Sequence, residues 1–507
     1  MGAAALLLAG SVLLSRVLGF VREAVLAWRV GVGPETDAYY AAFQIPDLLN
    51  YFLAGGALSI AFIPFYTRTR ERRGEEAARK LYATVLGTVG VLAVLATAVL
   101  WIWAEPLVAF QFRRFDAAQQ ALTVRLTRIV LPAQIAFATG GILRAVLMAH
   151  GHFRSQAAAP VLYNLGVIAG GVLLAPSLGV EGFAWGALVG AFVGPLGAAL
   201  LEARGRVPLA LRVAPGDRDL WRYLALAAPL MLGVTLLTVD EWYDRWFGQL
   251  VGTGAIAALF YARRLMQAPV AVVGQAVATA ALPALSRLWS EGRREELDAL
   301  VLRTLQASVA LGVIAAGAMI ALADPIVTLV YVRGAFEAAD AGPVAWLLRV
   351  FCLAVPGWIA QQIGVRAFYA RGDTWRPMLL GTAIALLAIP LYLALAPRLG
   401  AAGLAAAGAV AISANALATL LLARRLHGGP ALAPLAGSTA RALVIAAVAA
   451  APAWALLPGG TGTAGALVDL GLGAAVYGLA SAAGIAAVGD AETRRIARGL
   501  VRRLRGA

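Results

Sequence analysis

Four ionisable side chains interrupt the first apolar run of the sequence, SRVLGFVREAVLAWR: Arg16, Arg22, Glu23 and Arg29. A charged side chain at the centre of a membrane span costs about 2.5–3.5 kcal/mol on insertion scales, so each position needs a reason. Guanidinium groups bind phosphate oxygens through two parallel hydrogen bonds. Arg16 and Arg22 are therefore candidate ligands for a phosphate or pyrophosphate. The alternative is that they snorkel to the interface or pair with Glu23, which shares a helical face with Arg16.

The second apolar run opens with TDAYY, in which Thr36 is a candidate N-cap and Asp37 then lies in the first turn. A helix dipole favours an acidic residue at that place, which is one sufficient explanation for Asp37. The other interpretation makes Asp37 a counter-charge for an arginine of the first run, at a gate.

A second group of charges lies in the middle of the chain. Arg263 and Arg264 are adjacent in an apolar run, and adjacent helical residues point about 100° apart, so we expect at most one of them to face a cavity. Asp240 and Asp244 share a face at i,i+4 spacing and are a candidate site for a monovalent cation with oxygen ligands. They are equally candidate salt-bridge partners of Arg263 or Arg245.

Composition determines which elements carry these residues. The 507 residues are 61% hydrophobic and only 14% charged, whereas soluble proteins are about 45–50% apolar and about 25% charged. We therefore expect an all-α integral membrane protein, and no stretch has the period of two that a membrane β-barrel needs. The predicted spans number about 14: 3–30, 36–66, 80–104, 120–149, 153–175, 181–201, 220–248, 253–285, 296–322, 339–369, 374–396, 400–422, 440–457 and 463–489.

The rarer residues exclude several classes of chemistry. Cys352 is the one cysteine, so an internal disulfide or a cysteine metal cluster is excluded. Lys80 is the one lysine and is followed by Leu81, so the chain has no Walker A motif. We expect no cofactor, no metal centre and no enzymatic activity, and any transport must be driven by an ion gradient, the membrane potential or the substrate gradient. The net charge of +15 is spread between apolar runs, which argues against nucleic-acid binding.

Basic residues gather on one side of the predicted membrane. Alternate connections and the tail hold roughly 26 Lys and Arg residues, whereas the opposite side holds about four: Arg113, Arg114, Arg333 and Arg398. The positive-inside rule then places both termini in the cytoplasm. No basic stretch precedes the first apolar run, so we expect it to be a retained helix.

The chain contains an internal repeat. Pro64 and Pro283 occur in similar segments, and Val32-Gly33 precedes the first as Val251-Gly252 precedes the second. The copies begin on the same membrane side, which predicts two parallel six-helix lobes with a substrate between them near the midplane. The predicted domains are an N-terminal lobe (1–204), a cytoplasmic linker (205–219), a C-terminal lobe (220–427), two further helices (428–489) and a basic cytoplasmic tail (490–507).

Several short segments resemble the MurJ/MviN family of bacterial lipid II flippases. They occur in the same order as in the family and cover most of the first 380 residues: 15–23 (SRVLGFVRE), 36–39 (TDAY), 54–59 (AGGALS), 62–64 (FIP), 261–266 (YARRLM) and 368–373 (FYARGD). The resemblance implies the fold of the multidrug/oligosaccharidyl-lipid/polysaccharide exporter superfamily, with the last two helices forming a groove for the lipid tail. It also implies alternating access in the bacterial inner membrane, where lipid II, a polyprenyl-pyrophosphate glycolipid, moves from the inner to the outer leaflet for peptidoglycan synthesis.

The family's substrate-binding arginines fall on Arg16, Arg22 and Arg264. Its gate or counter-charge positions fall on Asp37, Glu23 and Asn50. Two departures stand out, because Asn50-Tyr51 replaces a basic pair of some relatives and Gly55 replaces an acidic residue.

The expected partners are lipid II, membrane lipids, a monovalent cation and cell-wall synthesis proteins. Two related functions compete with this interpretation: a flippase for another lipid-linked glycan, and a drug or cation antiporter of the same superfamily. A cationic-drug exporter needs a cavity dominated by acidic groups, whereas this sequence places arginines there. A membrane scaffold that recruits cell-wall enzymes without transport is the rival from another class.

Overall fold

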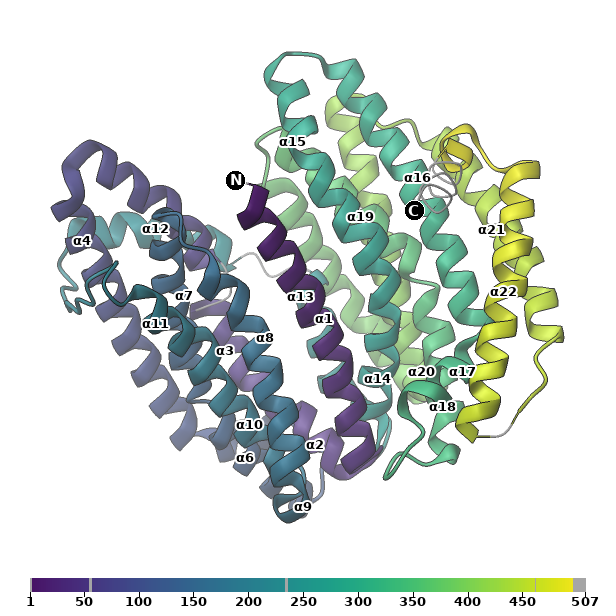
Figure 1. Ribbon diagram of the computed structural model, residues 1–507, viewed down its shortest axis with the longest axis horizontal. Coiled ribbons are helices and arrows are strands. Elements are labelled where there is room, and N and C mark those ends of the chain that lie inside the picture. The colour runs from purple at the N-terminus through teal and green to yellow at the C-terminus, as the bar shows by residue number, and fades with distance from the viewer. Residues whose placement is uncertain (1, 54–56, 233–235, 461, 496–507) are drawn as a thin grey trace. The chain divides into compact units, whose positions relative to one another are not determined.

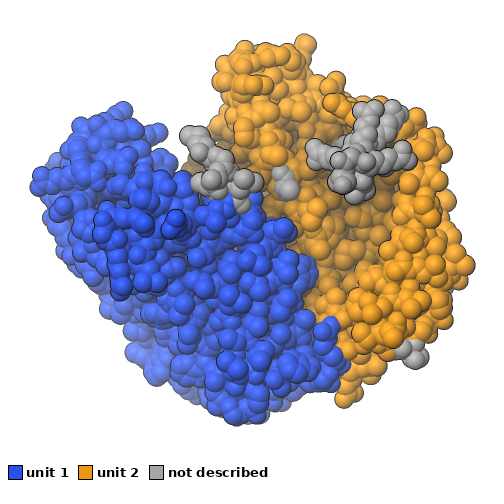
Figure 2. Space-filling model, viewed as in Figure 1, with its two compact units in different colours: residues 1–233, 333–336 blue, residues 234–332, 337–507 orange. Residues whose placement is uncertain are grey.

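The computed structural model describes residues 2–53, 57–232, 236–460 and 462–495. Helices and their connections make up this part of the chain, together with one isolated bridge between Arg333 and Phe336. The chain divides into two compact units, 1–233 with 333–336 and 234–332 with 337–507 (Figure 2). Residues 333–336 join unit 1 because the Ala335 N–H donates to the Trp28 carbonyl at 2.9 Å. The expected all-α fold is confirmed.

Unit 1 is built from the first helices of the chain (Figure 1). They are α1 (Gly2–Val30), α2 (Pro34–Ala42), α3 (Gln44–Leu53), α4 (Ala57–Ile102), α5 (Ala104–Gln111), α6 (Ala117–Val130), α7 (Ala133–Ala149), α8 (Arg154–Ala169), the π-helical turn η1 (Gly170–Leu174), α9 (Ala175–Leu178), α10 (Glu181–Ala191), η2 (Phe192–Ala198), α11 (Ala199–Ala203) and α12 (Arg218–Leu232). The last of these helices, α12, packs against α4.

Unit 2 holds the remaining helices. They are α13 (Leu236–Gly248), α14 (Ala255–Pro269), η3 (Val270–Gln275), α15 (Ala276–Ser290), α16 (Arg294–Ala321), α17 (Ala323–Tyr331), α18 (Ala338–Cys352), α19 (Val355–Ala370), α20 (Trp375–His427), α21 (Leu432–Ala455) and α22 (Gly462–Val488). The last two helices pack against each other, and α21 also packs along α16.

Nine helical stretches of the described chain are long and apolar enough to cross a membrane, or ten with the bent pair α18 and α19. Two long helices contain a break, at Gly74 (φ 85°) in α4 and at Gly400 (φ 61°) in α20. The left-handed region is open to glycine, so the chain turns there without strain. Both breaks coincide with predicted boundaries between spans. The chain is a multi-pass membrane protein, and the number of about 14 spans stays a prediction.

Glycines bring α8 and α10 close together in unit 1. A Cβ on Gly186 of α10 would lie 2.5 Å from the Gly166 carbonyl oxygen of α8, and one on Gly190 would lie 2.7 Å from the Tyr163 carbonyl oxygen. Small residues at four-residue spacing allow such backbone contact, which replaces the hydrophobic effect as the main source of helix association inside lipid. This packing fixes α8, whose polar residues contact α1.

Candidate functional site

Glu23 joins the first two helices of unit 1. Its carboxylate is buried and accepts a hydrogen bond from Arg22 Nη2 at 2.7 Å on one oxygen. The Tyr40 hydroxyl of α2 donates to the other oxygen at 2.5 Å. The structure contains one of the alternatives for the arginines of α1, the ion pair between Arg22 and Glu23. The carboxylate thereby fixes the orientation of the guanidinium group, and the Arg22 side chain as a whole is 21% exposed.

Arg22 also reaches α8. Its Nη1 donates to Asn164 Oδ1 at 3.3 Å, and Asn164 Nδ2 donates in turn to Ser15 Oγ at 3.2 Å. The α8 helix packs against α1, so Asn164 is held between two points of the same helix. A half-buried arginine with amide and carboxylate partners is a polar site at membrane depth. An anion can bind there by replacing one of those partners.

The remaining predicted residues of unit 1 differ in exposure. Arg16 is exposed on α1, Asn50 is half-buried in α3, and Asp37 is buried in the first turn of α2. Gly55 lies outside the described residues.

The prediction that Thr36 caps α2 is wrong. The helix begins at Pro34, with Gly33 at the N-cap position, and the Thr36 hydroxyl donates to the Gly31 carbonyl at 2.8 Å. Pro34 explains the earlier start, because its fixed φ suits the first helical position and its missing N–H is not needed there. Asp37 still lies in the first turn, as expected.

Unit 2 contains a buried ion-pair network on α13 and α14. Arg263 donates from Nε to Asp244 Oδ2 at 2.6 Å, and its Nη1 donates to Asp240 Oδ2. The Tyr392 hydroxyl of α20 donates to Asp240 Oδ1 at 2.9 Å. All three charged side chains are 0–3% exposed. Of the two alternatives for Asp240 and Asp244, the structure contains the salt bridge with Arg263, and the described residues include no cluster of three or more potential metal ligands.

Arg264 is linked to α13 at a different residue from Arg263. Its Nη1 lies 3.4 Å from Gln267 Oε1, and Gln267 Nε2 donates to Glu241 Oε1 at 3.1 Å. Arg264 is half-buried, whereas Arg263 is buried. Of the two arginines, Arg264 is therefore the one that a ligand can contact. Arg263 is used in the buried ion pairs with Asp240 and Asp244.

Sequence reasoning missed Tyr40, Asn164 and Tyr392. Asn164 was the detectable one, because an amide in the middle of the apolar run VLYNLGV needs a partner inside a membrane. The two tyrosines carry no such signal, since a tyrosine is common in membrane helices and its partner is known only after folding.

Comparisons with known proteins place the chain in a family. The profile of the family described as lipid II flippase MurJ matches residues 26–472. A probable lipid II flippase MurJ of Rhizobium tropici is 32% identical over 434 residues, 82% of this chain and 80% of the relative. The lipid II flippase MurJ of Burkholderia cenocepacia is 30% identical, covering 83% of each chain.

Solved structures agree on the fold. A lipid II flippase MurJ in an inward closed conformation superposes with a TM-score of 0.80 at 20% identity, covering 95% of this chain and 99% of that one. An inward-facing multidrug resistance MATE family transporter reaches a TM-score of 0.69 at 18% identity, covering 81% and 94%. The resemblance to the family is thus confirmed, and the chain belongs to the lipid II flippase MurJ family.

Proposed function

We propose that this chain moves lipid II from the inner to the outer leaflet of the bacterial cytoplasmic membrane by alternating access. The observation that carries the proposal is the match to the MurJ family over residues 26–472. Related folds have been solved as inward-facing and outward-facing MATE transporters, which supports rocking of two lobes as the mechanism. We take the lobes to be 1–204 and 220–427, with both termini in the cytoplasm.

Three arginines bind the diphosphate in this mechanism: Arg16, Arg22 and Arg264. A guanidinium group has five N–H donors, so Arg22 can hold a phosphate oxygen while Glu23 keeps it in place. Glu23 is then a positioning residue, and its negative charge limits how tightly the diphosphate is held. Asp37 and Asn50 act at the gates. The polyprenyl tail stays in lipid, beside the last two helices.

The energy source follows from the charges of unit 2. Because Arg263 already pairs with both Asp240 and Asp244, we propose that no monovalent cation is needed at these aspartates. Cationic side chains that cross part of the membrane field gain free energy, so the membrane potential is the proposed drive for the return step. Transport by reconstituted protein should then respond to an imposed potential, and equal rates with and without it would contradict this step.

The experiment that tests the function is complementation of flippase-depleted cells, with exposure of lipid II on the outer leaflet as the readout. Wild type should restore growth and exposure, whereas Arg16→Ala and Arg264→Ala should not. Arg425→Ala is the matched control, because Arg425 is an exposed arginine at the end of α20. A membrane scaffold would tolerate all three substitutions, and growth supported by Arg16→Ala and Arg264→Ala at normal protein levels would contradict the proposal.

A further inference from the structure

A stripe of polar side chains runs along the face of α1 that packs against α8. Ser15, Arg22 and Arg29 recur every seven residues, so their side chains lie about 20° apart around the helix. Ser11 precedes Ser15 by one turn on the same face. From Ser11 to Arg29 the helix rises by about 27 Å. The stripe therefore crosses most of the hydrocarbon layer of a membrane, which is roughly 30 Å thick.

Every member of the stripe contacts α8 or the π-helical turn η1 that continues it. The partners follow one another along the chain in the same order as the stripe: Ala157 for Ser11, Asn164 for Ser15 and Arg22, and Val172 for Arg29. The two helices thus run parallel, and the contacts form one polar seam inside unit 1.

Arg29 is at the end of this seam, in the last turn of α1. Its Nη2 donates to the Val172 carbonyl at 3.3 Å, and its guanidinium carbon lies 3.9 Å from the centre of the Trp28 ring. Its Nε is buried and has no hydrogen-bond partner. Among the described residues, no carboxylate lies within 4.0 Å of it, whereas Arg22 is paired with Glu23. Arg29 therefore keeps its positive charge without a counter-charge.

Two simpler explanations account for an arginine at this position. A helix dipole favours a cation in the last turn, and an arginine at the end of a span can extend its head group into water. Both explain the charge of Arg29, but neither explains its orientation. The side chain turns back to the Val172 carbonyl of η1, and π-helical turns are rare elements that recur at functional sites.

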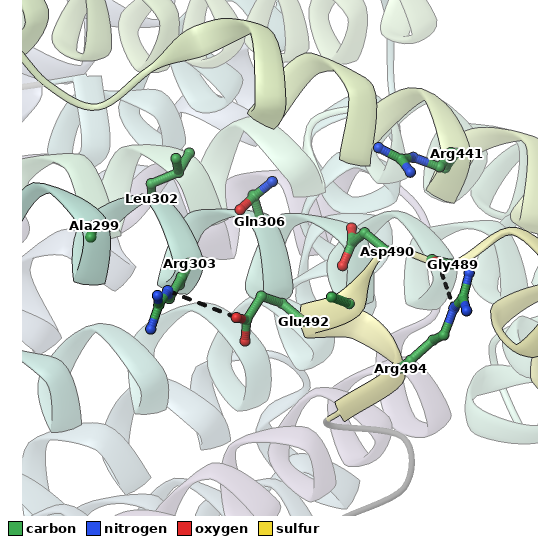
Figure 3. A pocket seen from close by; sticks show the side chains of 10 residues that line it. Ala299, Leu302, Arg303, Gln306, Arg441, Gly489, Asp490, Glu492 and Arg494 are labelled. Atoms are coloured by element: carbon green, nitrogen blue, oxygen red, sulfur yellow. Dashed lines mark hydrogen bonds and ion pairs between the residues drawn. The ribbon is translucent and has the colours of Figure 1, made fainter.

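The arginines around the cavity of unit 2 differ from Arg29. This cavity lies between α16, α21 and the segment after α22 (Figure 3). Two acidic residues, Asp490 and Glu492, line it together with its arginines, and Arg303 lies 3.9 Å from Glu492. An anion that enters this cavity meets carboxylates, whereas an anion at Arg29 meets a carbonyl and an aromatic ring.

We propose that Arg29 is a second binding site for the diphosphate, at the outer end of the seam. This inference rests on the proposed function and on the orientation in which α1 begins in the cytoplasm. Arg22 then holds the diphosphate at mid-depth, and Arg29, about 10 Å further along α1, binds it before lipid II enters the outer leaflet. A guanidinium group has five N–H donors, so the donors not used by Val172 can bind phosphate oxygens.

The fluorescence of Trp28 tests the site without transport. Purified full chain in detergent is titrated with inorganic pyrophosphate, and the emission of Trp28 is taken as the difference between wild type and Trp28→Phe. Pyrophosphate should change this emission, because it draws the guanidinium group away from the ring. Arg29→Gln should weaken the effect on the order of ten-fold, as loss of a charged hydrogen bond implies.

Arg113→Gln is the matched control. Arg113 also donates to a carbonyl, that of Phe110 at 3.2 Å, and lies over the ring of Phe110 at 4.8 Å, but it is not on α1. This variant should bind pyrophosphate at Trp28 as wild type does. Equal pyrophosphate affinity in wild type and Arg29→Gln would overturn the proposal.

Arg29→Lys separates phosphate binding from the effect of charge alone. Lysine keeps the positive charge at the helix end but lacks the planar fork of donors that matches a phosphate. The variant should therefore unfold at the wild-type temperature and bind pyrophosphate more weakly than wild type. Wild-type affinity in Arg29→Lys would show that the residue serves only as a charge. This variant also provides the comparison if Arg29→Gln does not fold.

Vesicles with labelled lipid II distinguish this proposal from the proposed function. Arg29→Gln should slow the appearance of lipid II on the outer leaflet several-fold. If wild type moves lipid II and Arg29→Gln moves it at the same rate, the flippase proposal stands and the outer site is wrong. If wild type moves no lipid II although pyrophosphate changes the emission of Trp28, the proposed function fails and only the anion site remains.

Discussion

Tyr40 donates a hydrogen bond of 2.5 Å to the carboxylate of Glu23, the same carboxylate that holds Arg22 at 2.7 Å. The orientation of an arginine on α1 is therefore set in part by a tyrosine on α2. Because the carboxylate is buried, both contacts are shielded from water and salt. This relationship makes the position of Arg22 sensitive to substitutions that never touch a substrate.

Glu23→Gln keeps the shape of the side chain but removes its charge. Hydrogen bonds to charged groups contribute about 1.5–3 kcal/mol, so the interaction that holds Arg22 in its orientation should weaken by a comparable amount. We expect the variant, at normal protein levels, to restore the growth of flippase-depleted cells less well than wild type. The measurement is the amount of lipid II exposed on the outer leaflet. Tyr40→Phe should have a smaller effect in the same direction. Full activity of both variants would show that Glu23 does not position Arg22.

Removal of Arg263 leaves two buried aspartates without a counter-charge. Breaking a buried ion pair from one side costs about 3–5 kcal/mol, so Arg263→Leu should strongly lower the thermal unfolding temperature in detergent. Neutralising the carboxylates as well, in Asp240→Asn/Asp244→Asn/Arg263→Leu, should recover much of that loss. A triple variant as unstable as the single one would mean that Arg263 contributes through packing and not through charge.

The same network predicts that transport does not depend on sodium. Replacing Na⁺ by an impermeant organic cation should leave the initial rate of lipid II movement in vesicles unchanged, because Arg263 already pairs with one oxygen of Asp240 and one of Asp244. The rate is measured at a fixed membrane potential. A several-fold decrease that returns on adding Na⁺ would contradict the internal ion pair.

Close packing of α8 and α10 predicts a large effect of one methyl group. Gly186→Ala would place Cβ 2.5 Å from the backbone carbonyl oxygen of Gly166. That distance is too short for a non-bonded contact, so the two helices would have to move apart. Overpacking costs about 1–3 kcal/mol, seen as a lower unfolding temperature. Gly471→Ala in α22 is the control, since nothing lies within 4 Å of that position. Equal unfolding temperatures for the two variants would rule out the contact.

The sequence alone predicts the class of fold, and it indicates charged side chains inside apolar runs without naming all their partners. Apolar runs are strong signals, and Gly74 and Gly400 mark real breaks because glycine is favoured at positive φ. The charges of Arg22 and Asp240 were also noticed, since charges inside apolar runs are rare. Their partners were harder to find. Tyr392 is 152 residues from Asp240 along the chain, and only packing brings the two together.

The start of α2 shows a different limit. Thr36 has the chemistry of an N-cap, but Pro34 begins the helix earlier and turns the hydroxyl of Thr36 toward Gly31. Competing local signals of similar strength, here a threonine and a proline, are decided by small free-energy differences that a sequence pattern does not rank.

The most direct measurement uses purified protein in vesicles that contain labelled lipid II, with the label accessible only on the outer leaflet. Wild type should move lipid II to the outer leaflet, and Arg22→Ala and Arg264→Ala should each reduce the rate at least ten-fold, as loss of a charged hydrogen bond of about 1.5–3 kcal/mol implies. Arg425→Ala should match wild type. Wild-type rates in both arginine variants would contradict the claim that these guanidinium groups bind the diphosphate.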